Sequence, residues 1–221
     1  MSMTSRVSSP GIAEAPQAFS SAHRIPLYLV PANNGITLAP WEFDEAHFEP
    51  GFRYELIFGV LIVNPAPLLE ERDPNGELEY LLRSYRKTHP EGKALDATAS
   101  EHDVIVGANR RRVDRAIWCG LGRLPRRTEV PTICVEFVSE GRRSQDRDYR
   151  EKRNEYKSVG VREYWIIDRF SRHMHVIRFD RDNEEEFIVD ESANYHSPQM
   201  PGFELPVGDI LSFADRWSEN M

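Results

Sequence analysis

Residues 131–169 constrain the fold more than any other part of the sequence, because two apolar runs flank a charged segment of helical character. The first run, residues 132–138, carries one acid, Glu136, among mostly apolar neighbours. Gly160 marks the end of the charged segment, and a second apolar run follows at residues 163–168. This order predicts a strand–helix–strand unit with parallel strands. A carboxylate inside a buried strand costs free energy unless a partner or a function compensates for it.

Length and composition predict one folded domain. A chain of 221 residues with 40% hydrophobic residues can bury a sizeable core. No apolar run approaches the roughly 18 residues that a membrane helix needs, so we expect a cytoplasmic protein without membrane contact. Residues 1–25 lack the apolar core of a secretory signal and are expected to form a flexible arm, which leaves residues 26–221 as the domain. Cys119 and Cys134 form no CxxC pair and are expected to be reduced core thiols.

The remaining segments predict one mixed sheet with helices against it. A hairpin is expected at residues 53–64, with its turn at 58–59. A helix is expected to begin at the turn-forming residues 73–76 and to carry an apolar stripe as far as His89. Further strands are expected at residues 94–99, 103–106 and 112–119, a second hairpin at 173–179 and 186–189, and an apolar closing segment within 197–211.

Two acids are predicted to meet on this sheet. Asp114 and Glu136 each lie in the middle of an apolar run. If their strands are neighbours, the two carboxylates converge and repel each other unless one is protonated or a cation lies between them. Oxygen ligands with room for water and phosphate are what Mg²⁺ prefers. Taken alone, the two acids favour the alternative in which each pairs with a nearby arginine.

A lysine is predicted to face the same sheet. Tyr149, Lys152, Tyr156 and Val159 follow one another at i, i+3, i+7 and i+10, which is one stripe of a helix. Lys152 therefore belongs to the face that packs on the sheet. It forms either a structural ion pair or a catalytic cation that orients a water and stabilises charge on a phosphate.

The charge distribution leaves two interpretations open. A formal net charge of −8 argues against a protein that coats nucleic acid non-specifically. Arginine and lysine are nevertheless concentrated at residues 110–127 and 142–153, which flank the two acid-bearing strands. Each cluster is either a solvated face or a site that contacts phosphates.

Several motifs resemble the PD-(D/E)XK nuclease superfamily and, more closely, its bacterial Uma-two family of restriction endonucleases. The resemblance runs from about residue 54 to residue 211. Its carriers are Tyr54-Glu55-Leu56-Ile57 with Gly59, Val113-Asp114, Val135-Glu136-Phe137-Val138-Ser139, Asp148, Lys152, Tyr156, Gly160-Val161, Glu163-Tyr164-Trp165-Ile166-Ile167-Asp168 and Pro201-Gly202-Phe203.

The resemblance implies an α/β fold, namely a restriction-endonuclease-like mixed β-sheet core of order αβββαβ with flanking helices and extra hairpins. It also implies an endodeoxyribonuclease that hydrolyses the phosphodiester bonds of DNA with Mg²⁺ or Mn²⁺. Asp114, Glu136 and the backbone carbonyl of Phe137 would be the metal ligands, and Lys152 would replace the lysine that other members carry two residues after the glutamate. Glu55 would join the metal shell or orient Lys152. A homodimer is an open alternative, because nucleases that cut both strands commonly act as symmetric dimers.

Two positions depart from the family pattern. Val113 stands where the family usually has proline, and Asn75-Gly76 stands where many members place a histidine at the start of the first helix. The missing histidine and the acidic net charge favour a rival function, a catalytically silent nuclease fold that binds nucleic acid or acts in assembly. The complete set of aspartate, glutamate and lysine favours the enzyme.

Overall fold

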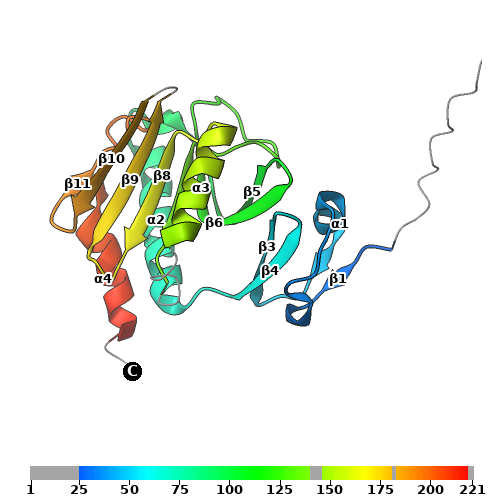
Figure 1. Cartoon of the computed structure of the whole chain (residues 1–221). Helices are drawn as coiled ribbons and strands as arrows, with labels where there is room; N and C mark the ends of the chain where they lie inside the picture. Colours follow the sequence, from blue (N-terminus) through cyan, green and yellow to red (C-terminus); the bar gives the residue numbers. More distant parts are fainter. Residues whose placement is uncertain (1–24, 140–145, 181–182, 219–221) are drawn as a thin grey trace, which may run out of the picture.

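The computed structural model describes residues 25–139, 146–180 and 183–218, and its centre is a large mixed β-sheet with helices on both faces (Figure 1). The predicted α/β class, with a mixed sheet, flanking helices and extra hairpins, is confirmed. Of the expected N-terminal arm, only Ile25 lies within the described residues. No helix in these ranges is long and apolar enough to cross a membrane.

The elements are as follows. The strands are β1 (Tyr28–Leu29), β2 (His47–Phe48), β3 (Phe52–Ile57), β4 (Val60–Pro65), β5 (Leu95–Val106), β6 (Asn109–Cys119), β7 (Ile133–Phe137), β8 (Glu163–Asp168), β9 (His173–Asp180), β10 (Asn183–Asp190), β11 (Asn194–Tyr195) and β12 (Leu205–Pro206). The helices are α1 (Pro40–Glu45), α2 (Leu69–Thr88), α3 (Asp146–Val159) and α4 (Val207–Ser218), with short 3-10 helices η1 (Pro31–Asn33) and η2 (Gly92–Ala94).

The large sheet has the strand order β10-β9-β8-β7-β6-β3-β4, and β5 also pairs with β6. β7 and β8 run parallel, with Ile133 opposite Glu163, and α3 connects them. The strand–helix–strand unit predicted from the sequence is therefore confirmed. The other strand pairs of this sheet in the described part of the chain are antiparallel.

Strand β6 changes its partner along one edge. β5 occupies one edge of β6 from Asn109 to Cys119. On the opposite edge, β3 pairs at Arg110 and β7 pairs at residues 115–117. Neither pairing covers residues 111–114, so this edge of the sheet is interrupted there. We call these four residues the edge break.

Helices cover the two faces of the sheet with separate apolar layers. On one face, Leu78 and Leu82 of α2 pack with Val135 of β7 and with the buried residues of α4. On the other face, Tyr156 of α3 packs with Cys134 of β7. Figure 1 shows α3 in front of the sheet, with α2 and α4 behind it. A lysine on the inner face of α3 is thereby placed against β7.

A third apolar cluster supports the β3–β4 hairpin, which the sequence predicted correctly. Leu29 of β1 and Phe43 of α1 pack against Tyr54 and Leu56 of β3, and all four are buried. The N-terminal elements therefore fix the strand that approaches the edge break.

The two cysteines are free thiols, as predicted. Cys134 is fully buried, and Cys119 is partly exposed. Burial, reinforced by the neighbouring Glu136 carboxylate, raises the pKa of Cys134 well above its ordinary value. Burial also raises the pKa of Cys119, to about 12. Both thiols therefore stay protonated at neutral pH.

The predicted start of the first long helix was wrong. α2 begins at Leu69 and runs through Pro74 and Gly76, where turn chemistry predicted its first residue. A proline inside a helix removes one backbone hydrogen bond. Tertiary contacts outweigh that loss, because Pro74 is buried and the side chain of Asn75 bonds to β6.

Two further segments differ from the prediction. The strands expected at 94–99 and 103–106 form one continuous strand, β5, in which Glu101 has a positive φ of 52°. The C-terminal closing segment is a 12-residue helix, α4. Val207, Ile210 and Leu211 of α4 are buried at helical spacing, a signal that was present in the sequence.

A buried acid on β8 anchors the C-terminal segment to the sheet. Glu163 is 1% exposed, and its carboxylate accepts hydrogen bonds from Trp165 Nε1 at 2.8 Å, Tyr195 Oη at 2.7 Å and Ser197 Oγ at 2.9 Å. Three neutral donors thus stabilise the carboxylate in place of water. The first glutamate of the Glu163-Tyr164-Trp165 segment therefore has a structural role.

We expect the substitution E163Q to lower the free energy of unfolding by about 2–4 kcal/mol, because the amide NH₂ would face buried donors. The matched control is E185Q, since Glu185 is 66% exposed and pairs with Arg178 at 3.3 Å. That change should cost no more than about 1 kcal/mol. Urea unfolding followed by circular dichroism measures both, and equal small losses would show that Glu163 is not an anchor.

Candidate active site

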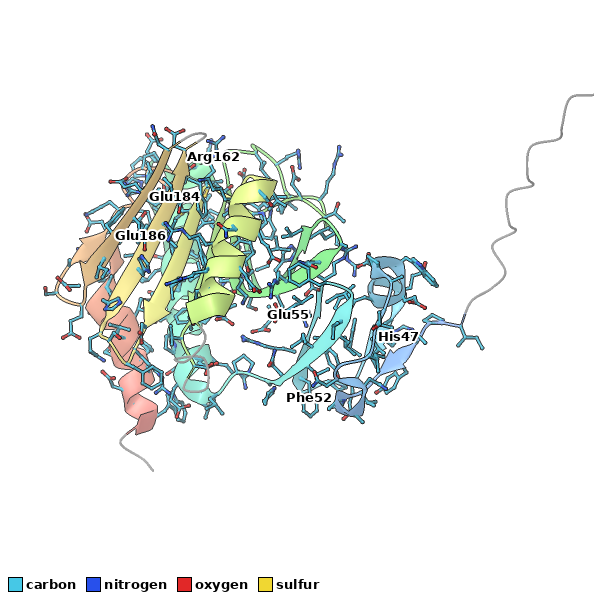
Figure 2. All side chains as sticks on the ribbon, in the orientation of Figure 1. His47, Phe52, Glu55, Arg162, Glu184 and Glu186 are labelled. Atoms are coloured by element: carbon cyan, nitrogen blue, oxygen red, sulfur yellow. The ribbon has the colours of Figure 1, made fainter. Side chains whose placement is uncertain are left out.

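Near the edge break, two backbone N–H groups donate to side-chain carboxylates instead of to the carbonyl groups of a neighbouring strand. Oε1 of Glu55, on β3, accepts the backbone N–H of Arg112 at 3.1 Å. Oδ2 of Asp114, on β6, accepts the backbone N–H of Phe137 at 2.6 Å. Buried backbone donors need acceptors, and apolar side chains at these positions would supply none. The interruption of the sheet therefore explains why acids are tolerated inside it. Figure 2 shows Glu55 on the side of the hairpin that faces the rest of the sheet.

The pairing of β6 with β7 brings Asp114 and Glu136 onto neighbouring strands. The last pair is Arg115 with Val135, and the two acids are the residues that follow this pair. Strand alternation sets both acids on the face opposite to that of Arg115 and Val135. Asp114 is 2% exposed and Glu136 is 0% exposed. The two acids predicted from the sequence thus come together on neighbouring strands.

Glu136 is held from α3. Lys152 Nζ donates to Glu136 Oε1 at 2.9 Å, and Tyr156 Oη donates to the same oxygen at 3.3 Å. Lys152 and Tyr156 are fully buried, as the helical stripe predicted. Burial and the neighbouring Glu136 raise the pKa of Tyr156 well above its ordinary value, so its hydroxyl remains a neutral donor.

Asp114 is held from β3. Arg53 Nη2 donates to Asp114 Oδ1, while Arg53 Nε donates to Glu101 Oε2 at 3.0 Å. Burial alone would lower the pKa of Arg53, but Asp114 and Glu101 raise it above its ordinary value, so the guanidinium stays charged. The structure therefore pairs each candidate metal ligand with a protein cation, Arg53 with Asp114 and Lys152 with Glu136. The pairing with an arginine that the two acids alone favoured is thus found for Asp114, whereas Glu136 pairs with the lysine of α3.

Asn75 ties α2 to the acid-bearing strand. Its Nδ2 donates to the backbone carbonyl of Asp114 at 2.9 Å, and its Oδ1 accepts from Arg115 Nε at 2.6 Å. Arg115 also donates to Glu79 of α2 at 3.0 Å. Asn75 therefore fixes the backbone of Asp114 and the side chain of Arg115 against α2.

A cleft of about 440 Å³ opens beside Asp114. Its lining includes Arg53, Glu71, Asn75, Glu101, Arg112 and Asp114. Glu136 and Lys152 are 0% exposed and do not line the cleft. Of the two candidate acids, only Asp114 is therefore within reach of a group in this cleft.

The ionisable side chains around the edge break carry a net negative charge. We call six residues the acid–base cluster: Arg53, Glu55, Glu101, Asp114, Glu136 and Lys152. Its four carboxylates and two cations carry a net charge of −2 when all are ionised. Within the described residues, no three His, Cys, Asp or Glu side chains lie close enough to hold a metal by themselves. In proteins, Mg²⁺ commonly binds through one or two carboxylates and takes its other ligands from water and phosphate.

Three of the seven arginines of the first basic cluster are buried and bonded within the protein, which neither interpretation of that cluster anticipated. Arg110 donates to both carboxylate oxygens of Asp44 at 2.6 Å. Arg111 is 0% exposed and pairs with Glu155 of α3 at 2.5 Å. Arg115 is buried against α2. In the second cluster, Arg153 pairs with Glu184 and Glu186, which lie beside α3 in Figure 2.

Three contributors to the site were missed at the sequence level. Arg53 lies 61 residues from Asp114 in the chain, and Glu101 lies 48 residues from Arg53. Asn75 was noted only as a departure from a family pattern. For Arg53, its position two residues before Glu55 on one strand was the available signal, because alternate residues of a strand share a face.

Comparisons with known proteins agree on family and fold. A family model for Uma2, described as "Putative restriction endonuclease", matches residues 40–208. The crystal structure of a putative nuclease belonging to DUF820 from Anabaena variabilis ATCC 29413 is similar, with a TM-score of 0.65 and 17% sequence identity. That match covers 80% of this chain and 99% of the other, and at this identity it shows the fold. No curated protein matches the sequence.

We expect the substitution K152M to lower the free energy of unfolding by about 3–5 kcal/mol, because it leaves Glu136 buried without its cation. The double substitution E136Q/K152M should be less destabilised than K152M, since it removes both charges. Chemical denaturation measures each variant.

The matched control for this prediction is K157M on the same helix. Lys157 also forms one ion pair, with Glu184 at 2.8 Å, but it is 39% exposed. Its loss should cost about 0–1 kcal/mol. If K152M and K157M cost the same, the pair between Lys152 and Glu136 is not a buried structural element.

Proposed function

Because the chain belongs to the Uma2 family of putative restriction endonucleases, we propose that it is a divalent-metal-dependent endonuclease that hydrolyses DNA phosphodiester bonds. One observation carries the proposal: Asp114 and Glu136 follow the last pair of the neighbouring strands β6 and β7, and Lys152 contacts Glu136 from α3. Two carboxylates and a lysine, held on rigid elements, match what phosphodiester hydrolysis requires.

Asp114 and Glu136 are the proposed ligands of Mg²⁺ or Mn²⁺, with the backbone carbonyl of Phe137 as a third. When bound, such an ion lowers the pKa of a water and neutralises charge on the phosphate. Asp114 lies at the cleft and accepts the N–H of the Glu136–Phe137 peptide, so it fixes the backbone of β7 directly after Glu136. The carboxylate of Asp114 and this backbone are thus held in one arrangement before substrate arrives.

Lys152 is the proposed catalytic cation. Its ammonium donates to Glu136 and holds that carboxylate in place, and its proposed role in the reaction is to orient the attacking water or to stabilise charge on a phosphate oxygen. Tyr156 donates to the same carboxylate oxygen and limits its rotation. Glu55 accepts a backbone N–H of β6, so its proposed role is to hold the strand next to Asp114 in register.

The cleft is the proposed entry for the DNA backbone. Arg72 is exposed and Arg112 is partly exposed, and both line the cleft that reaches Asp114. Contacts to phosphate oxygens position a nucleic acid without reading its sequence. With a net charge of −8, the protein would bind DNA through this local surface and not through its overall charge.

A catalytically silent nucleic-acid-binding or assembly module is the second candidate. Its support is the pairing of both proposed metal ligands, Asp114 with Arg53 and Glu136 with Lys152. In a silent module, these pairs would persist in the presence of divalent ions. The two candidates therefore differ in whether metal ions produce cleavage.

We expect the wild-type protein to nick supercoiled plasmid DNA in the presence of Mn²⁺, and a chelator to abolish the nicking. D114N and E136Q keep the size of each side chain and should lower the rate by about 10²–10³-fold. K157M, on the solvent side of α3, should keep the wild-type rate within about twofold, as expected for an exposed ion pair.

Agarose-gel conversion of supercoiled to open-circular plasmid gives these rates. Wild-type rates in folded D114N and E136Q would refute the assignment of the two acids. Absence of nicking, combined with absence of Mn²⁺ binding in calorimetry, would establish the silent module.

A further inference from the structure

Arg53 holds two acids at once. Its Nη2 donates to Asp114 Oδ1 and also to Glu101 Oε1 at 2.5 Å, and its Nε donates to Glu101 Oε2 at 3.0 Å. The contact with Glu101 is bidentate, whereas the contact with Asp114 uses one nitrogen. If Arg53 loses Asp114 as a partner, it therefore still has a bidentate ion pair with Glu101, and its backbone need not move.

Asp114 has both carboxylate oxygens engaged within the protein. Oδ1 accepts from Arg53, and Oδ2 accepts from the backbone N–H of Phe137. The bond to the Phe137 peptide belongs to the frame of the sheet, whereas Arg53 is a side chain with a second partner. A metal ion that binds Asp114 therefore competes with Arg53 for Oδ1, because both are cations.

Glu101 adopts a costly backbone conformation beside this arginine. The pairing of β5 with β6 sets Ser100 opposite Arg115 and His102 opposite Val113, and it passes over Glu101. Glu101 has a φ of 52°, in the left-handed region that L-residues other than asparagine and aspartate seldom occupy. Strain of this kind persists where the surroundings enforce it and often marks a functional position.

The three residues form a path from the buried ligand to the cleft. The side chain of Asp114 is 2% exposed, that of Arg53 is 8% exposed and that of Glu101 is 35% exposed. All three line the cleft. A guanidinium that leaves Asp114 and stays on Glu101 therefore turns toward the space that a phosphate group would occupy.

We infer that Arg53 is the counter-ion of Asp114 in the metal-free protein. When Asp114 binds a divalent cation, the Arg53 guanidinium leaves Asp114 and keeps Glu101 as its partner. Arg53 thus stabilises the metal-free protein, and Glu101 determines how readily Arg53 releases Asp114. This inference rests on the proposed function, because it takes Asp114 as a metal ligand. It makes Arg53 and Glu101 positioning residues with opposite effects on the affinity for metal.

Isothermal titration calorimetry with MnCl₂ on the full chain tests this inference. R53Q should bind Mn²⁺ about tenfold more tightly than wild type, because one competing charge is removed from contact with a ligand. E101Q should bind about fivefold more weakly, because Arg53 then has Asp114 as its remaining carboxylate partner. In R53Q/E101Q, the second change should alter the affinity of R53Q by less than about twofold, since Glu101 acts through Arg53.

The matched control is R112Q, which removes the same charge from the same cleft. Arg112 pairs with Asp103 at 3.1 Å, and its side chain also lines the cleft beside Asp114. If only the loss of one positive charge mattered, R112Q would change the Mn²⁺ affinity as much as R53Q does. If Arg53 acts as the counter-ion of Asp114, R112Q should change the Mn²⁺ affinity by less than about twofold. D114N should abolish binding.

Each outcome separates this inference from the proposed function. If wild type binds Mn²⁺ and D114N does not, but R53Q binds no more tightly, then the metal site stands and the counter-ion is refuted. If R53Q fails to fold, an unchanged affinity in E101Q refutes it in the same way. If wild type binds no Mn²⁺, the proposed metal site is refuted, and this inference with it.

Discussion

The structure depends on how one edge of β6 exchanges β3 for β7. Between the two partners, the backbone of β6 and the end of β7 present N–H groups that no sheet ladder satisfies, and the carboxylates of Glu55 and Asp114 accept them. Buried acids then require cations, and Arg53 and Lys152 supply them from β3 and α3. The interruption of the sheet thus calls for the buried acids, and the buried acids call for the cations that β3 and α3 bring to β6 and β7.

This arrangement explains how a fold with a well-packed core can hold the residues of the proposed active site. Apolar layers under α2, α4 and α3 hold the sheet on both faces, and the edge break is the place where charged side chains replace them. Buried ion pairs in general add little net stability compared with apolar packing of the same volume. The proposed chemistry therefore accounts for the pair of Lys152 and Glu136 better than stability does.

Much of this was predictable from the sequence, because it rests on local periodicity. The apolar runs around Glu136 predicted β7 and β8, and the spacing of Tyr149, Lys152 and Tyr156 predicted which face of α3 is buried. The start of α2 was not predictable from turn chemistry, because Asn75 gains its contacts from β6, about 40 residues away. The pairing of Arg53 with Asp114 was equally hidden, because it depends on the register of strands far apart in the chain.

The most direct test of the central claim is the anomalous scattering of Mn²⁺ in crystals of the protein. The account predicts one Mn²⁺ ion between the carboxylates of Asp114 and Glu136, with Arg53 on Glu101 alone. Mn²⁺ bound elsewhere or absent at millimolar concentration, with Arg53 still on Asp114, would contradict it. In that case, the edge break would be a structural ion-pair network and not a catalytic centre.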